Sequence, residues 1–142
     1  MHSVEPSHDR FRAFQVGAEN TGPVVMINLL RYRPQAQYSE DFDATPCTGR
    51  EAYQRYSAAA VRQIDAVAGR VIFWGSVQAT VIAPDGEEWD DAFMVEYPNR
   101  AAMLKMLSTP DYLAVVPHRT AALLDSRLIA TQPRVSALGL LE

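Results

Sequence analysis

The stretch that organises the chain is PDYLAVVPHRTAALLD, residues 110–125. Three apolar residues and one arginine recur in it at intervals of four, three and four, the spacing of one helix face: Tyr112, Val116, Arg119 and Leu123. The pattern predicts a helix whose apolar inner face carries one charge. Burying a guanidinium costs on the order of several kcal/mol unless a partner or a bound anion satisfies its donors. Arg119 is therefore the principal candidate for a ligand-binding residue.

Pro117 leaves the phase of this helix face open. A proline inside a helix removes one backbone hydrogen bond and disfavours helical geometry at the preceding residue. If the phase changes there, His118, about 100° away around the helix, takes the inward position instead of Arg119. The residues leave a pocket role and a salt-bridge role open for Arg119, and they favour an ordinary, partly exposed position for His118 over catalysis.

The residues on the N-terminal side of this helix predict a β-hairpin. VIFWGSVQATVIA (71–83) has the apolar and β-branched content of a long strand. Pro84-Asp85-Gly86 is a turn sequence, and a return strand is expected at about 89–97. Both faces of the first strand carry large apolar side chains, so the sheet would expose a second apolar face. A homodimer that joins two such faces is the economical solution.

The rest of the chain divides into conventional elements. They are a leading helix at about 5–17, a buried strand at 24–31, a loop at 33–49, a helix at about 50–68, a helix from about 99 to 107 and a closing strand at 127–131. The order strand, helix, strand, strand, helix, strand indicates an α+β protein of the ferredoxin-like βαββαβ kind with a four-stranded antiparallel sheet. We expect one domain over residues 1–142, with its core at about 23–132 and a tail at 133–142.

Composition narrows the classes of function. Of the 142 residues, 48% are hydrophobic and 21% charged, with a net charge of −4, as in a globular protein without a membrane span. The acidic charge makes nucleic acid an unsuitable partner, and the charged N-terminus favours a cytoplasmic location. The three histidines lack metal-ligand spacing and no cofactor signature occurs, so neither a metal nor a cofactor is expected.

Several polar and aromatic residues are candidates for the wall of a site. Asn28 lies within the apolar strand VVMINLL, where its amide needs hydrogen-bond partners; a structural role is favoured over ligand contact. Six aromatic residues could line a cavity between sheet and helices, although core packing is the simpler role for each: Tyr53, Tyr56, Trp74, Trp89, Tyr97 and Tyr112.

The segments NLLRYR (28–33) and GEEWDDAFMVEYPNRAAMLKMLSTPDYLAVVPHRTAALLDSRLIAT (86–131) resemble the domain of unknown function 1330 family, within the dimeric α-β barrel superfamily. The resemblance implies two sheets packed face to face and a cavity between sheet and helices in each subunit. Superfamily members include cofactor-independent monooxygenases, isomerases and haem-binding enzymes. Some use an asparagine, a tryptophan and an arginine or histidine around the substrate, to which Asn28, Trp74 or Trp89, and His118 or Arg119 would correspond.

Two functional hypotheses follow. In the first, the protein is a homodimeric enzyme of the monooxygenase or isomerase kind that acts on a small aromatic or carboxylate-bearing substrate. Arg119 would hold the anion, Asn28 would donate to an oxyanion and His118 would carry a proton. In the second, the same cavity belongs to a non-catalytic dimeric module that binds a metabolite. A structural role for Arg119, paired with a carboxylate such as Glu96, would remove the site altogether.

Overall fold

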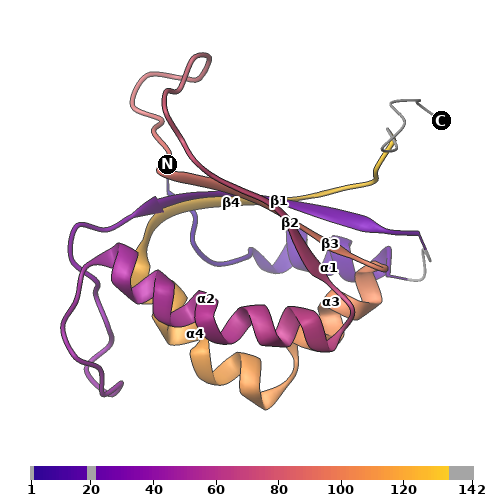
Figure 1. The fold of residues 1–142 in the computed structure, drawn as a ribbon, viewed down its shortest axis with the longest axis horizontal. Coiled ribbons are helices and arrows are strands. Elements are labelled where there is room, and N and C mark those ends of the chain that lie inside the picture. Colours follow the sequence, from indigo (N-terminus) through magenta and orange to yellow (C-terminus); the bar gives the residue numbers. More distant parts are fainter. Residues whose placement is uncertain (1, 19–21, 135–142) are drawn as a thin grey trace.

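The computed structural model describes residues 2–18 and 22–134 of the chain. Its elements are, in order, α1 (His8–Val16), β1 (Val24–Tyr32), α2 (Gly49–Ala66), β2 (Arg70–Ser76), β3 (Asp91–Tyr97), α3 (Arg100–Leu107), α4 (Pro110–Ala122) and β4 (Leu123–Thr131). Figure 1 shows the strands as one layer, with α2 and α4 packed together on one side of it. Among the described helices, none combines the length and apolar character needed to cross a membrane.

The four strands form one sheet in the order β2-β3-β1-β4, and every neighbouring pair is antiparallel. With helices between β1 and β2 and between β3 and β4, this is the ferredoxin-like arrangement, which confirms the predicted fold class. The leading helix is present as α1, capped by Ser7. The predicted tail falls mostly outside the described residues, which end at residue 134.

The core lies between the sheet and the helices, because side chains that face the helices alternate with side chains that face away from them along β1 and β3. Val24, Met26 and Leu30 of β1 belong to the core cluster. Successive side chains of a strand point to opposite faces, so Ile27 and Leu29 lie on the other face of the sheet. The second face stays partly open: Ile129, which pairs with Ile27, is 50% exposed.

Two helix boundaries follow local sequence signals. The Thr48 hydroxyl accepts from the Glu51 N–H and the Glu51 carboxylate accepts from the Thr48 N–H, a capping box that starts α2. Thr109 caps α4, and Pro110 occupies the first turn, where its missing N–H is harmless. Both starts agree with the prediction.

The last strand is longer than predicted. Residues 123–125 were expected to continue the helix, but β4 begins at Leu123 and pairs with β1 from there. The predicted strand covered only residues 127–131. Leu123 and Ser126 are buried, so pairing with the end of β1 supplies hydrogen bonds that override the helical pattern of this stretch.

The hairpin strand 71–83 is shorter than predicted and ends at Ser76. Residues 77–90 instead form an irregular connection, which we call the β2–β3 arm. Figure 1 shows the arm rising from the sheet on the side opposite α2 and α4. Regular pairing with β3 ends at Ser76 and Asp91, and one further backbone hydrogen bond follows, from the Val77 N–H to the Asp90 carbonyl at 2.8 Å. Val81 and Ile82 in the arm are 87% and 94% exposed.

Replacement of Gly49 by alanine is expected to lower the free energy of unfolding by at least about 1–3 kcal/mol. A Cβ there would lie 2.2 Å from the Arg33 carbonyl oxygen and 2.6 Å from that of Ala122, and neither backbone can move freely. Gly22→Ala is the matched control, because a Cβ at Gly22 meets nothing within 4 Å. Urea unfolding of both variants measures the difference; equal stabilities would contradict the close approach at Gly49.

Candidate ligand-binding site

Arg119 of α4 points into the molecule, as the helical pattern predicted. Its Nη1 donates to the carbonyl oxygen of Val4 at 2.7 Å. Burial raises the pKa of the Tyr53 phenol, and the positive charge of Arg119 lowers it. This effect of Arg119 places the two groups close together. Tyr53 itself is 3% exposed. The guanidinium therefore lies at the boundary between α4, α2 and the N-terminal segment.

No carboxylate of the described residues forms an ion pair with Arg119. Glu96, the acidic partner considered for it, pairs instead with Arg70 at 3.0 Å. Glu96 is opposite Val25 of β1, so it lies on the open face of the sheet, away from the helices. The salt-bridge role is therefore wrong for this pair, and the charge of Arg119 is met by a neutral carbonyl.

Three tyrosines surround the inner end of Arg119. The Tyr56 and Tyr112 hydroxyls are hydrogen-bonded at 2.8 Å, and the Tyr53 and Tyr56 rings lie 5.1 Å apart. Burial, and then the neighbouring Tyr112 phenol, raise the pKa of Tyr56 well above its ordinary value. The Tyr53 and Tyr56 phenols consequently stay protonated and can donate hydrogen bonds at neutral pH.

The N-terminal segment covers Arg119 and the tyrosines on the side of β4. Ser3, Val4 and Glu5, here called the N-terminal strap, are held by the end of α4 and the start of β4. The contacts are Ser3 N–H to Asp125 Oδ1 at 2.8 Å, Ser126 hydroxyl to Ser3 O at 2.7 Å, Arg119 to Val4 O, and Thr120 hydroxyl to Glu5 Oε1 at 2.7 Å. The strap thus occupies one hydrogen-bond donor of Arg119.

His118 lies away from Arg119 and contacts the loop at residues 33–48. Its Nδ1 is 2.7 Å from the Tyr38 hydroxyl, and its ring meets that of Phe42 edge-on at 5.3 Å. Burial, and then the charge of Arg55, lower the pKa of His118. The two residues are therefore not one unit: Arg119 takes the inward position and His118 anchors the loop.

Asn28 is buried on the helix side of β1, and its amide donates to the Met26 carbonyl two residues away at 3.2 Å. This is the structural role favoured for it. Tyr97 is likewise buried, and its hydroxyl contacts the Met106 sulfur at 3.9 Å. Neither contact reaches Arg119.

The two tryptophans lie on different faces of the sheet. Trp74 stacks on Phe93 at 4.1 Å, on the helix side. Trp89 belongs to the β2–β3 arm, where Arg127 lies over its ring at 5.0 Å. Since Arg127 is opposite Leu29, this contact lies on the open face. The prediction that Trp89 lines the interior is therefore wrong, because the arm turns back over the other side of the sheet.

Asp91 and Tyr32 are interior polar residues that the sequence reasoning missed. The Tyr32 hydroxyl donates to Asp91 Oδ2 at 2.6 Å, and Asp91 is 5% exposed. The signal was present in the alternation of β3, since Asp91 has the same parity as the core residues Phe93 and Val95.

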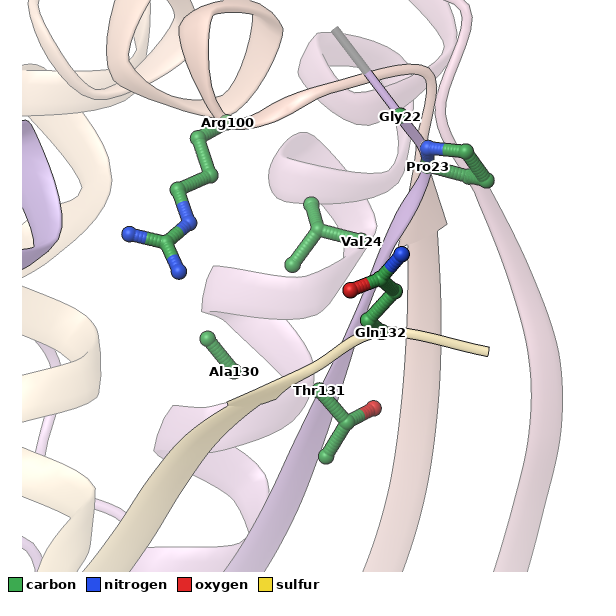
Figure 2. Close-up of a pocket in the computed structure, with 7 residues that line it drawn as sticks. All are labelled: Gly22, Pro23, Val24, Arg100, Ala130, Thr131 and Gln132. Carbon is green, nitrogen blue, oxygen red and sulfur yellow. The ribbon is translucent and has the colours of Figure 1, made fainter. Parts of the chain in front are cut away.

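Two surface pockets lie elsewhere. One, of about 290 Å³, is shown in Figure 2, with the Arg100 guanidinium beside Val24 and Ala130 at the far end of β1 and β4. The other, of about 240 Å³, lies on α4 beside Pro117 and Thr120. Neither is lined by Arg119 or the tyrosines. Within the described residues, no group of three or more histidine, cysteine or acidic side chains is arranged to hold a metal ion.

The topology defines an α+β protein with the ferredoxin-like fold. The chain belongs to the domain of unknown function 1330 family (DUF1330), whose model matches residues 44–131. No curated protein shows significant similarity to it.

Solved structures agree with this assignment. The chain is 35% identical to a protein of unknown function from Rhodopseudomonas palustris, over 94% of this chain and 98% of that one, with a TM-score of 0.85. The methylated form of that protein is 36% identical over 93% and 95% of the chains, with a TM-score of 0.86. A hydroxynitrile lyase from Passiflora edulis is 10% identical over 82% and 97%, with a TM-score of 0.51, and shares the fold alone.

We expect His118 to titrate below 6.5, because burial and then Arg55 disfavour its charged form. The neutral ring then contributes its full stability above a pH of about 6.5, and this contribution is lost as the pH falls from there towards the folded-state pKa. An NMR titration of the imidazole measures this pKa. Arg55→Gln should raise it; an unchanged value would contradict the effect of the Arg55 charge.

Proposed function

We propose that the protein binds a small carboxylate or enolate ligand, aromatic or otherwise apolar in its remainder, between the sheet and helices α2 and α4. Arg119 is the anchor for the anion. The observation that carries the proposal is an inward guanidinium whose described hydrogen-bond partner is a neutral carbonyl, with no carboxylate of the described residues beside it. A charged donor that lacks a charged acceptor favours an anionic ligand.

The surrounding phenols suit the same ligand. Tyr53 and Tyr56 present protonated hydroxyls, and Tyr112 adds a further hydroxyl and ring. They offer hydrogen bonds to an anion and contact area to an apolar body. An enolate or oxyanion that forms during a reaction would be stabilised by Arg119 and these donors. Asn28 is a weaker candidate for that role, since its amide already donates to Met26. His118 is not part of the proposed machinery.

Access requires a change at the N-terminal strap. The Val4 carbonyl oxygen accepts the Arg119 hydrogen bond that a ligand carboxylate would take over, so the ligand and the strap compete for Arg119. Asp125 holds the start of the strap. Burial raises the pKa of the Asp125 carboxyl, but hydrogen bonds from Ser3, Arg127 and Ser126 outweigh this effect, so the pKa is lowered overall. The anchor is therefore a carboxylate that is charged at neutral pH.

The first test uses benzoate as the probe. We expect millimolar benzoate to raise the melting temperature of the wild type, and Arg119→Gln to weaken its binding about 10- to 100-fold, which is the effect expected for losing a charged hydrogen bond. Arg62→Gln, which removes an exposed arginine from α2, is the matched control. Equal shifts in wild type and Arg119→Gln would exclude Arg119 as the anchor.

Two classes of function share this site. We favour an enzyme of the isomerase or monooxygenase kind, because preorganised donors around an anion can stabilise a transition state. The alternative is a non-catalytic module that only holds a metabolite. Once a ligand is known, mass spectrometry and NMR of the incubated ligand separate the two: a chemical change that Arg119→Gln abolishes supports the enzyme, and an unchanged ligand supports the module.

We further propose that two copies pair through their open sheet faces. This face carries Ile27, Leu29 and Met94, together with Phe73 and Ile129, which are 49% and 50% exposed. Apolar side chains in such number on one flat surface favour association. The exposed Val81 and Ile82 of the β2–β3 arm rise on the same side of the sheet, so a partner there would cover them as well (Figure 1).

Light scattering at micromolar concentration is expected to give twice the mass of one chain. Ile129→Lys should shift the protein towards the monomer, because a charge would be placed within the apolar face. Val61→Lys is the control: Val61 has the same exposure, 49%, but lies on α2. A monomeric wild type, or dimers of equal strength in both variants, would contradict pairing through this face.

A further inference from the structure

The carboxylate of Asp91 is buried, and only one of its two oxygens has hydrogen-bond partners among the described residues. Its Oδ2 accepts from the Tyr32 hydroxyl at 2.6 Å and from Trp74 Nε1 at 3.4 Å, and Arg50 Nη1 lies 3.5 Å away. Its Oδ1 is buried and has no hydrogen-bond partner among the described residues. Because almost all buried polar atoms of proteins are hydrogen-bonded, this oxygen indicates a missing donor.

The surroundings of Asp91 leave a route to solvent. Trp74, which covers it from β2, is 41% exposed, and the Arg50 side chain is 53% exposed. Arg50 lies over the Tyr32 ring at 4.6 Å rather than forming a short ion pair. β2 is an edge strand of the sheet, so Trp74 lies at the border of the sheet. The proposed ligand would approach Asp91 past these two exposed side chains.

Asp91 and Arg119 lie at the same end of the sheet–helix sandwich, and Tyr53 lies near both. The Tyr53 ring is 5.7 Å from that of Tyr32 and 6.2 Å from that of Trp74, the two side chains that donate to Asp91. Asp91 begins β3, Arg119 lies one turn before the end of α4, and Tyr53 lies one turn after the start of α2. The charges of both residues act on the pKa of the Tyr53 phenol, Arg119 lowering it and Asp91 raising it. One ligand placed along Tyr53 would therefore meet a cation on one side and a free carboxylate oxygen on the other.

The charges nearby decide which donor suits Asp91. A ligand ammonium would enter a region that already holds the guanidinium groups of Arg50 and Arg119, and like charges repel. A hydroxyl adds no charge and supplies the single donor that Oδ1 lacks. The aromatic walls formed by Trp74, Tyr32 and Tyr53 match an apolar ligand body.

We propose that Asp91, oriented by Tyr32 and Trp74, accepts a hydrogen bond from a hydroxyl group of the ligand, so that the ligands of this protein are small hydroxy acids. This inference rests on the proposed function, since Arg119 holds the carboxylate of the same molecule. Asp91 also becomes the group placed to take the hydroxyl proton if the ligand is chemically changed.

Three probes with one carbon skeleton test the proposal by calorimetry: phenylacetate, each enantiomer of mandelate, and phenylglycine. Beside the same carboxylate, phenylacetate carries no further polar group, mandelate carries a hydroxyl and phenylglycine carries an ammonium group. In the wild type we expect one mandelate enantiomer to bind about tenfold more tightly than phenylacetate, as for one hydrogen bond to a charged acceptor. Phenylglycine should bind no more tightly than phenylacetate.

Variants assign the preference to Asp91. Asp91→Ala should lower the affinity for mandelate to the affinity for phenylacetate. Phenylacetate binding should persist, which also shows that the variant is folded. If Asp91→Ala does not fold, Asp91→Asn serves: its neutral acceptor should reduce the preference at least about threefold. Asp111→Asn, which alters an exposed carboxylate of α4, should leave the preference unchanged.

The outcomes separate this inference from the proposed function. A mandelate preference that survives Asp91→Ala, an equal affinity for mandelate and phenylacetate, or a preference for phenylglycine would overturn the role of Asp91 while the Arg119 site stands. Failure of all three probes to bind the wild type would overturn the Arg119 site, and the hydroxy-acid assignment with it.

Discussion

The structure depends on a short junction where two helices meet the end of β1. The Arg33 N–H donates to the Ala122 carbonyl at 2.8 Å, and the Arg33 carbonyl accepts from the Gly49 N–H at 3.1 Å, so one residue joins the end of α4 to the start of α2. Gly49 is required there because a Cβ would collide with both carbonyls. With these ends held together, the residues one turn into each helix, Tyr53 and Arg119, are brought close to each other.

The interior above the sheet is unusually polar for a small core. A cation, three phenols and a carboxylate lie among apolar side chains, and the described contacts satisfy them unevenly: Arg119 meets a carbonyl, and Asp91 keeps one free oxygen. A core selected only for stability would bury such groups as satisfied pairs or omit them. The incomplete hydrogen bonding of Arg119 and Asp91 is the physical basis for placing a ligand there. The open sheet face is apolar instead and suits a second copy of the chain.

Much of the fold was predictable from local signals. The capping box at Thr48, Thr109 followed by Pro110, and the apolar run of β1 each specify an element, and their order led to the correct fold class. The errors lie where pairing partners decide. β2 ends at Ser76 and β4 begins at Leu123 because of where β3 and β1 offer hydrogen bonds, which no local propensity reports. Of the candidate site, the inward position of Arg119 beside the tyrosines agrees with the helical pattern, but Trp89 was placed on the wrong face and Asp91 was missed.

The sequence by itself determined that one charge of the last helix faces inward, because helical periodicity places Arg119 in line with Tyr112 and Val116. Only the tertiary structure decided between Arg119 and His118, since the choice depends on how Pro117 is accommodated and on a loop, at Tyr38 and Phe42, that comes from elsewhere in the chain. It also revealed the Val4 carbonyl and Asp91 as neighbours of the interior tyrosines. Such contacts join residues more than 50 positions apart, and folding creates them without leaving a periodic pattern in the sequence.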